Sequence, residues 1–528
     1  MQPAPTVEPH AIRLRAGGAR PFWLAFGILF ALTATWSLAS PLASGPDENA
    51  HIVKAAGVVR GDLRGHSTPD NPGAGSVTVP YLYRFTLDYP ACFAFRGAEP
   101  ADCAPAMPEG DAAEVPTDTS TWVIRNNPLY YALVGTPTLL PPSTLNLYLM
   151  RLLSAAVCSA VLAWGFREVL ALRRRPLVTV GVVAALTPMV VYLNSTVNPS
   201  ALEISAAVTL WVCLLALVRA PDPTRLRSRA AGIAVVAVLL ANTRGLSPVW
   251  VALIALTVVA VGPWSGVRAV LTDRRSWPWL AVVVLGTGAA LAWTFSAGTL
   301  EAGGADHPEL GFLSTANRTF FDTGDFLVAS IGRFGWLDTS LPQLVYMVYT
   351  ALIGLPTLLA LSLARRRDQL AMLVVIGVAV LVPTFLHAWQ ARSVGYIWTA
   401  RYSIPLFVGV VVVAGFIGRD AVRGLPRWVE QRLVSTLVPL LAVGQLIAFL
   451  VNLRRYTVGD GGSWRQILSG EWAPPVPSVL LLLVQVGALA AGTWALTRPQ
   501  PDLEPDVDPD DGPDVTPDER QPEGAAAR

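Results

Sequence analysis

The chain has 528 residues, of which 53% are apolar and only 14% are charged, whereas ordinary soluble domains carry roughly 25% charged residues. This composition excludes a soluble enzyme and excludes disorder over most of the length, so we expect an all-α polytopic membrane protein whose immediate partner is the lipid bilayer. Ten acidic residues and two arginines give residues 499–528 a charge of −8, and the other residues sum to +10. This positive charge is too diffuse for a nucleic-acid partner.

Twelve apolar segments are predicted to span the membrane, because a helix needs about 20 apolar residues to cross the hydrocarbon core. They are residues 21–40, 144–172, 176–195, 200–219, 230–243, 247–263, 277–298, 341–363, 369–390, 402–419, 433–453 and 476–497, within a transmembrane domain over 21–497. The fifth segment is short. Thr243, Arg244 and Gly245 interrupt the apolar run, and Pro248 follows, which favours a tight turn between two helices over one long span.

The loops between these segments predict the orientation, because positive charge is retained on the cytoplasmic side of a membrane. Alternate loops carry arginine clusters, at residues 173–175, 225–229, 274–275, 365–367 and 419–432. We therefore expect a multi-pass protein of the cytoplasmic membrane with both termini in the cytoplasm. The N-terminal part is residues 1–20, and the acidic, Pro-rich tail over 498–528 is expected to be disordered. The first apolar run is longer than that of an ordinary signal peptide, so we assign it as a span.

Two long segments are expected on the outer side. Residues 41–143 form the first extracytoplasmic loop, with interfacial helices, and residues 299–340 form the second, with an interfacial helix near 326–334. Cys92 and Cys103 both lie in the first loop, where an oxidising compartment would allow a disulfide between them. Two free thiols are the alternative.

An acidic cluster follows the first span directly. Asp47 and Glu48 are adjacent, and His51 lies four residues after Asp47. A carboxylate at this depth can act as a general base on an acceptor hydroxyl or hold a divalent cation, and the histidine can bind a phosphate or steady the carboxylate. The alternative is ordinary helix-start chemistry, with Ser44 as N-cap and Pro46 in the first turn.

Other polar residues lie near the outer helix ends. Asn127 and Tyr130 precede an apolar stretch too short to span, and they form either one wall of a lipid-and-sugar cleft or an interfacial aromatic belt. Glu203 falls at a helix start or slightly inside the bilayer, where it is either a functional residue or a first-turn acid. Arg151 and Arg244 lie near outer helix ends, from which each can snorkel to the interface.

A last cluster precedes the tenth segment. Arg401 opens this span from the outer side, next to Tyr402 and downstream of Arg392. A guanidinium there suits a phosphate or diphosphate group, and an interfacial anchor is the alternative. No Gly-rich phosphate loop precedes a helix and no GxSxG signature occurs, so nucleotide-driven chemistry is not expected.

Several short motifs recur in the order of a known family. They are Pro46-Asp47-Glu48 with His51, Asn127-Pro128-Leu129-Tyr130-Tyr131, Pro188-Met189 followed by Asn198-Pro199, Gly335-Trp336-Leu337-Asp338 with Leu341-Pro342, and Arg401-Tyr402 with Pro405. Over about residues 20–495, this ordered set resembles the bacterial membrane family catalogued as domain of unknown function 2142.

That family in turn resembles the multi-span glycosyltransferases of the GT-C type, which take sugars from polyprenyl-phosphate donors and carry an acidic pair in the first outer loop. The resemblance implies a GT-C-like bundle in which Asp47 or Glu48 is the catalytic acid or base. It also implies that Tyr130 and Arg401 line the site. The chain departs from the family's pattern at Asn49, Asn127, Ser200 and Ala400.

The leading hypothesis is a membrane glycosyltransferase that moves a sugar from a polyprenyl-phosphate-linked donor onto a cell-envelope glycan or lipid at the outer face. Asp47 and Glu48 are its candidate catalytic residues. The candidate substrate-binding residues are His51, Asn127, Tyr130, Glu203, Arg244, Arg392, Arg401 and Tyr402. A divalent cation is the candidate cofactor, with Asp47, Glu48 and His51 as its candidate ligands. The alternatives are a transporter or flippase of lipid-linked glycans and a non-catalytic envelope-assembly protein.

Overall fold

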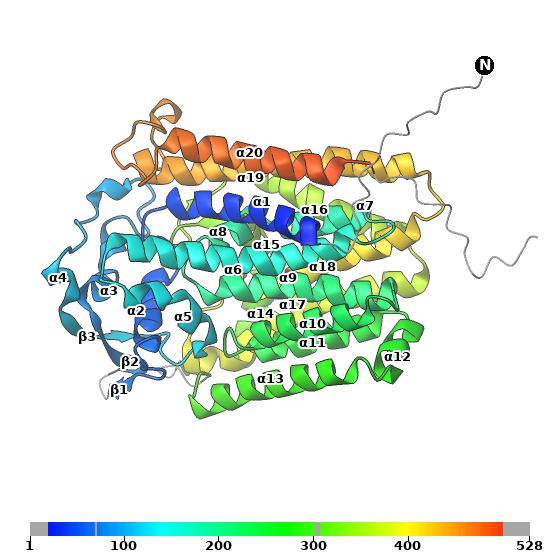
Figure 1. The fold of residues 1–528 in the computed structure, drawn as a ribbon, viewed down its shortest axis with the longest axis horizontal. Helices are drawn as coiled ribbons and strands as arrows, with labels where there is room; N and C mark the ends of the chain where they lie inside the picture. Colours follow the sequence, from blue (N-terminus) through cyan, green and yellow to red (C-terminus); the bar gives the residue numbers. More distant parts are fainter. Residues whose placement is uncertain (1–18, 69–70, 301–306, 500–528) are drawn as a thin grey trace, which may run out of the picture. The chain divides into compact units, whose positions relative to one another are not determined.

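All twelve apolar segments form helices in the computed structural model, which describes residues 19–68, 71–300 and 307–499. These helices run side by side as one bundle (Figure 1). They are α1 (Ala19–Leu38), α6 (Thr144–Leu170), α7 (Pro176–Ala185), α8 (Pro188–Asn194), α9 (Pro199–Arg219), α10 (Leu226–Ala241), α11 (Ser247–Val261), α13 (Trp277–Ser296), α16 (Gln343–Leu363), α17 (Arg366–Val394), α18 (Ala400–Ala421), α19 (Arg427–Val458) and α20 (Ser478–Thr497). The predicted all-α polytopic class is confirmed. Nearly all of the predicted N-terminal segment and C-terminal tail lies outside the described residues.

The predicted number of spans is too high when each helix is judged by length. Of the described helices, nine are long and apolar enough to cross a membrane, and α7 with α8, bent by 61°, gives a tenth if the pair counts as one span. The helices α10 and α11 have 16 and 15 residues, which at 1.5 Å per residue is at most about 24 Å, short of a hydrocarbon core of about 30 Å. They lie alongside the other bundle helices (Figure 1), and the predicted tight turn at Arg244 joins them.

The break between α7 and α8 follows from a proline. Pro188 occupies the first turn of α8, and a residue before proline is pushed out of the helical region. Side-chain hydrogen bonds hold both residues at the break. Gln445 donates its Nε2 hydrogen to the Leu186 carbonyl at 2.6 Å, and the Thr187 hydroxyl donates to the Ser330 carbonyl at 2.6 Å. The break is therefore a packed structural bend.

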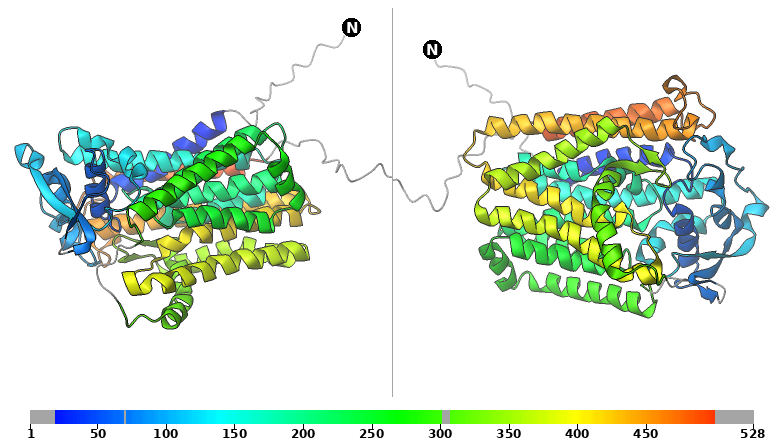
Figure 2. Two further views of the ribbon diagram at one scale, coloured as in Figure 1. Left: turned by 90° about the horizontal axis from the view of Figure 1, so that it is seen from below. Right: turned by 180° about the vertical axis from the view of Figure 1, so that it is seen from behind.

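Residues 45–143, which we call the cap, lie at one end of the bundle (Figures 1 and 2). Their elements are α2 (Glu48–Val58), β1 (His66–Thr68), β2 (Asn71–Pro80), α3 (Tyr81–Phe85), the 3-10 helices η1 (Tyr89–Cys92) and η2 (Ala101–Cys103), α4 (Asp111–Glu114), β3 (Pro116–Thr121), α5 (Pro128–Val134) and the 3-10 helix η3 (Thr136–Leu139). The three strands form an antiparallel sheet in the order β1-β2-β3, with Val77 opposite Thr119. This sheet was not predicted from the sequence, because its strands are rich in Gly, Ser and Thr.

A disulfide within the cap and a buried arginine of the bundle hold the outer part of the cap in place. Cys92 and Cys103 form a disulfide. Arg455 of α19 is buried, and its guanidinium donates to three backbone carbonyls between residues 93 and 99, at 2.6 to 2.9 Å. A charged donor that serves three carbonyls holds this loop in one geometry against the helix end.

The remaining elements connect the long helices. They are α12 (Trp264–Thr272), α14 (Phe312–Phe321), α15 (Thr323–Gly332), the hairpin strands β4 (Arg333–Phe334) and β5 (Thr339–Ser340), and the 3-10 helix η4 (Trp464–Gln466). Helix α15 covers most of the predicted interfacial segment 326–334 and packs on α8 and α18.

Buried ion pairs join the helices at the end of the bundle opposite the cap. Glu168 of α6 accepts hydrogen bonds from Arg225 at 2.8 Å and from Arg229 at 3.1 Å. Arg174 pairs with Glu430, which links the α6–α7 connection to α19. The connections that carry the arginine clusters lie at this end, where α1 also starts and α20 also ends (Figure 1).

Candidate functional site

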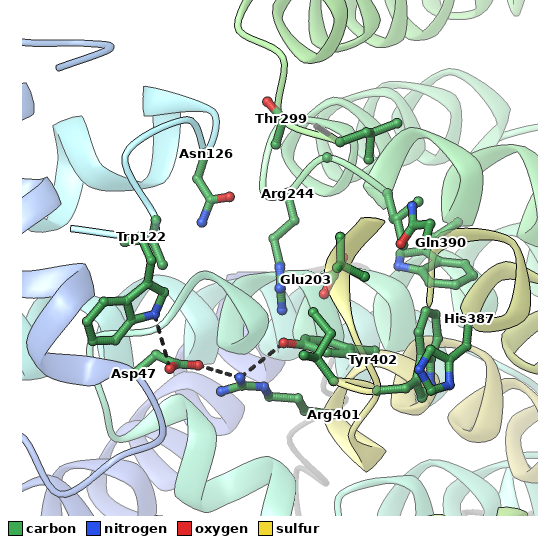
Figure 3. A pocket seen from close by; sticks show the side chains of 18 of the residues that line it. Asp47, Trp122, Asn126, Glu203, Arg244, Thr299, His387, Gln390, Arg401 and Tyr402 are labelled. Carbon is green, nitrogen blue, oxygen red and sulfur yellow. Dashed lines mark hydrogen bonds and ion pairs between the residues drawn. The ribbon is translucent and has the colours of Figure 1, made fainter. Parts of the chain in front are cut away.

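A cavity of about 270 Å³ lies where the cap meets the bundle (Figure 3). Its walls come from α2 and the segment after β3 in the cap, and from α9, α11, α17 and α18 in the bundle, together with the turns that precede α11 and α18. The polar and aromatic side chains that line it are Asp47, His51, Trp122, Asn126, Glu203, Arg244, Trp250, Thr299, His387, Gln390, Trp398, Arg401 and Tyr402.

Asp47 occupies the N-cap position of α2 in a left-handed conformation, with φ of 60°. A non-glycine residue pays roughly 1–2 kcal/mol for such a backbone, so the surrounding contacts must hold it there. Its carboxylate pairs with Arg401 and accepts a hydrogen bond from the Trp122 indole at 3.3 Å. Burial by itself raises the pKa of Asp47, but the charges of Arg401 and Arg244 and the hydrogen bond from Arg401 outweigh burial, so the net pKa is lowered and the carboxylate is ionised at neutral pH.

Two guanidinium groups reach the cavity from different elements. Arg401, in the first turn of α18, donates to the Pro46 carbonyl at 3.2 Å and to the Tyr402 hydroxyl at 3.1 Å, besides its pairing with Asp47. Arg244, in the turn before α11, lies 4.5 Å from the centre of the Tyr402 ring and donates to the Ser200 hydroxyl at 2.8 Å. Both side chains are therefore held in fixed positions by neutral as well as charged partners.

Glu203 supplies a second carboxylate to the cavity from α9. It is buried and accepts a hydrogen bond from the Ser247 hydroxyl at 2.5 Å. The same hydroxyl accepts a hydrogen bond from the Arg244 backbone amide at 3.1 Å. The carboxylate is thus tied through Ser247 to the turn that presents Arg244, and it balances part of the positive charge.

His51 faces the cavity from α2 and is oriented by two cap residues. The Tyr131 hydroxyl lies 2.9 Å from His51 Nδ1 and accepts a hydrogen bond from the Asn126 amide at 2.9 Å. If the hydroxyl donates to Nδ1, the ring proton of neutral His51 lies on Nε2; if it accepts from Nδ1, the proton lies on Nδ1. Burial, together with the nearby charges of Arg244 and Arg401, lowers the pKa of His51 to about 3, although Asp47 opposes this shift. The imidazole is neutral at pH 7.

The structure separates the two adjacent acids. Glu48 does not line the cavity. It is fully buried and forms a two-fold ion pair with Arg151 of α6, with both nitrogen–oxygen distances at 2.6 Å. It also accepts backbone hydrogen bonds from Gly45 and Val197 at 3.0 Å. Arg151 is likewise buried and does not snorkel, which corrects that expectation.

Two of the predicted substrate-binding residues each lie next in the sequence to a residue that contributes to the site. Asn127 caps α5, and Tyr130 is buried with its hydroxyl 2.9 Å from Ser154, so neither lines the cavity. Their neighbours Asn126 and Tyr131 instead build the His51 site. Arg392 is exposed and does not line the cavity.

Helix α17 contributes residues that the sequence analysis did not select. His387, Gln390 and Val394 line the cavity, at spacings of three and four residues that place them on one helix face. Arg392 lies two residues after Gln390 and faces elsewhere. Polar residues repeating at this spacing within a predicted span were the available signal.

The residues proposed as metal ligands do not converge. Across residues 19–68, 71–300 and 307–499, no group of three or more His, Cys, Asp or Glu side chains is arranged to hold a metal ion. Glu48 faces Arg151 while Asp47 and His51 face the cavity. The predicted trio of Asp47, Glu48 and His51 is therefore not assembled.

The chain was compared with known proteins. A family model described as "Predicted membrane protein (DUF2142)" matches residues 30–410. Every residue that lines the cavity falls within this range. No curated protein and no solved structure matches the chain.

Proposed function

The chain belongs to the DUF2142 family of predicted membrane proteins, and on that premise we propose that it is a membrane glycosyltransferase. In this proposal it transfers a sugar from a polyprenyl-phosphate donor to a cell-envelope glycan or lipid at the outer face of the cytoplasmic membrane. The polyprenyl chain stays in the bilayer, and its phosphate-sugar head reaches the cavity between the cap and the bundle.

One observation carries this proposal: the Asp47 carboxylate and two guanidinium groups meet in one cavity at the capped end of an apolar bundle. Guanidinium groups bind phosphate oxygens through paired hydrogen bonds, which suits Arg401 and Arg244 to a phosphate leaving group. The ionised carboxylate of Asp47 suits the role of general base. Tyr402, which contacts both arginines, keeps them on the same side of the cavity.

The proposed reaction is a single displacement. The acceptor hydroxyl oxygen attacks the anomeric carbon of the sugar, and the bond between that carbon and the phosphate oxygen breaks. The electron pair of this bond goes to the phosphate, where Arg401 and Arg244 stabilise the added charge. The hydroxyl proton goes to Asp47. Glu48 has no part in this step, because it is buried against Arg151.

The broken helix pair does not favour the transporter alternative. Transporters often use discontinuous helices to bind substrate near the centre of the membrane. Here the two residues at the break between α7 and α8 are hydrogen-bonded to Gln445 and to the Ser330 carbonyl, and neither Leu186 nor Thr187 lines the polar cavity. The polar cavity residues instead gather at the capped end of the bundle.

The proposal is tested by replacing Asp47 and Arg401 in cells. Asp47→Asn and Arg401→Gln should each reproduce the envelope-glycan composition of a deletion strain, since one lacks the base and the other lacks a phosphate ligand. The matched control is Asp325→Asn. Asp325 also pairs with an arginine, Arg333, but this pair is exposed and outside the cavity.

Membrane levels of each variant are measured by immunoblotting, so that a loss of function is separated from a loss of protein. The control should retain the glycans of the native strain. Native glycans in both Asp47→Asn and Arg401→Gln cells, at normal membrane levels, would exclude the catalytic role.

A further inference from the structure

One wall of the cavity carries no charged side chain. It is formed by α17 and by the segment that leads into α18, and its members are His387, Gln390, Val394, Ile397 and Trp398. Figure 3 shows His387 and Gln390 on the side away from Asp47 and Trp122, with Arg244 and Arg401 between the two sides. We call these five residues the neutral wall.

The neutral wall holds polar groups that lack protein partners. The side-chain amide of Gln390 makes no hydrogen bond to any residue in the described part of the chain. His387 is buried, and its Nδ1 lies 2.9 Å from the Thr319 hydroxyl. Its Nε2 forms no hydrogen bond of good geometry, although the Gly395 backbone carbonyl is a weak hydrogen-bond acceptor for the ring. A buried group such as His387 Nε2 rarely lacks a good partner unless a ligand or water supplies one, and the half-buried Gln390 amide is free to bind the same ligand.

The same wall presents a fixed aromatic surface. Trp398 is buried and donates its indole hydrogen to the Ser403 hydroxyl at 3.0 Å. Its ring stacks on His387 with a centroid distance of 5.7 Å and meets Tyr402 edge to face at 5.5 Å. Aromatic rings beside a few amide and imidazole groups are the usual lining of a site for a neutral ligand with both apolar and polar parts.

We propose that the neutral wall binds a pyranose ring, with Gln390 and His387 accepting and donating hydrogen bonds to its hydroxyl groups and Trp398 contacting its apolar face. This inference rests on the proposed function and adds the place of the sugar. The ring belongs either to the lipid-phosphate donor or to the acceptor glycan. The cavity then has two parts. The arginines bind the phosphate, and the uncharged neutral wall binds the sugar.

The test uses the full-length protein in a zwitterionic detergent, because maltoside detergents would themselves supply sugar. The donor probes are farnesyl phosphate and the same lipid carrying glucose, mannose or galactose. The acceptor probes are the octyl glycosides of these three hexoses below their micelle concentrations, with octanol as the sugar-free counterpart. Affinities are measured for the native protein, for Gln390→Leu, and for His387→Phe in case one variant fails to fold.

The matched control is Gln369→Leu, which removes a glutamine near the other end of α17. The amide of Gln369 donates to the Leu361 carbonyl at 2.8 Å, away from the cavity. Arg401→Gln is included because it should weaken every phosphate-bearing probe, with or without sugar.

For a donor sugar, one farnesyl phosphohexose should bind more tightly than farnesyl phosphate, and Gln390→Leu should remove this advantage of about tenfold. For an acceptor sugar, an octyl hexoside should lose affinity in Gln390→Leu but not in Arg401→Gln. The inference is overturned if no hexose improves binding of either carrier, or if the advantage survives in both wall variants. Unchanged farnesyl phosphate binding in Arg401→Gln would instead contradict the proposed function.

Discussion

Asp47 and Arg401 hold each other in a closed pair, and this pairing limits what the cavity can bind. Arg401 is buried and also serves the Pro46 carbonyl and the Tyr402 hydroxyl. A phosphate that binds Arg401 must therefore compete with the carboxylate. Binding of the phosphate would also make Asp47 a stronger base. The positive charge of Arg401, which lowers the pKa of Asp47, would then be shared with the phosphate.

The competition predicts opposite effects on binding and on transfer. Asp47→Asn should bind farnesyl phosphate more tightly than the native protein, by roughly tenfold, because a charged hydrogen-bond competitor is removed. The same variant should not restore envelope glycans in a deletion strain. Binding is measured on the purified protein, with Asp325→Asn as the control. Weaker binding in Asp47→Asn would show that the carboxylate supports the phosphate site instead of competing for it.

The buried neutral state of His51 predicts how stability depends on pH. Its pKa is about 3 in the folded protein and about 6.5 in an unfolded chain. Between these values the unfolded state binds more protons, so stability falls as the pH falls below about 6.5. At pH 5 this linkage is worth about 2 kcal/mol.

Thermal unfolding in detergent at pH 7 and pH 5 checks this prediction. Between pH 7 and pH 5, the native protein should lose about 2 kcal/mol more of its free energy of unfolding than His51→Gln does. His66→Gln is the matched control, because the His66 side chain is 84% exposed. Equal losses in the native protein and in His51→Gln would mean that His51 is protonated in both states.

Buried ion pairs join several helices, and these pairs determine how firmly the helices are held against one another. Glu48 at the start of α2 and Arg151 on α6 pair with no solvent contact, and Arg151 also donates to carbonyls at the end of α1. The pair therefore fastens the first turn of the cap to two bundle helices. Removing one partner leaves the other charge buried, which typically costs 3–5 kcal/mol.

This arrangement predicts a structural phenotype for Glu48. Glu48→Gln should lower the unfolding temperature and the membrane level of the protein far more than Asp47→Asn does, since only Glu48 has a buried charge with no route to water. Asp88→Asn is the control, because Asp88 pairs with Arg84 in exposed positions. If the Glu48→Gln protein has native stability but fails to transfer sugar, Glu48 has a catalytic role and the structural explanation is wrong.

The sequence was sufficient to predict the helices of the bundle but only part of the site. Long apolar runs locate spans regardless of context, so all twelve segments proved helical. Side-chain direction depends on where each helix begins and how it rotates. That is why Asn127 and Tyr130 were predicted where their neighbours Asn126 and Tyr131 form the hydrogen bonds that orient His51, and why the different surroundings of Asp47 and Glu48 were not predicted. The cap sheet escaped prediction because β1 and β3 are polar and hydrophobic alternation in β2 is limited to Val77 and Val79.

At the scale of the whole molecule, the cap and the arginine clusters occupy opposite ends of the bundle. The arginine-rich end is expected in the cytoplasm, which would place the cavity outside. A substituted-cysteine experiment checks this orientation. The native Cys158 and Cys213 are buried, and Cys92 and Cys103 are disulfide-bonded. Labelling with a thiol reagent therefore reports on a single introduced cysteine.

Ser120→Cys in the cap should react with a membrane-impermeant maleimide in intact spheroplasts. Ser228→Cys near the start of α10 should react only after the membrane is opened. Both positions are exposed in the structure, so access to the reagent decides the result. The reverse pattern would place the cavity in the cytosol and exclude chemistry on the outer face.

The central claim is that the cavity holds the phosphate of a lipid through Arg401 and Arg244. The most direct measurement is native mass spectrometry of the protein purified from its own membranes, with the bound lipids identified by fragmentation. The native protein is predicted to retain polyprenyl-phosphate lipids, and both Arg401→Gln and Arg244→Gln are predicted to lose them while the Asp325→Asn control keeps them. Retention of these lipids at native levels in both arginine variants, or their absence from the native protein, would contradict the claim.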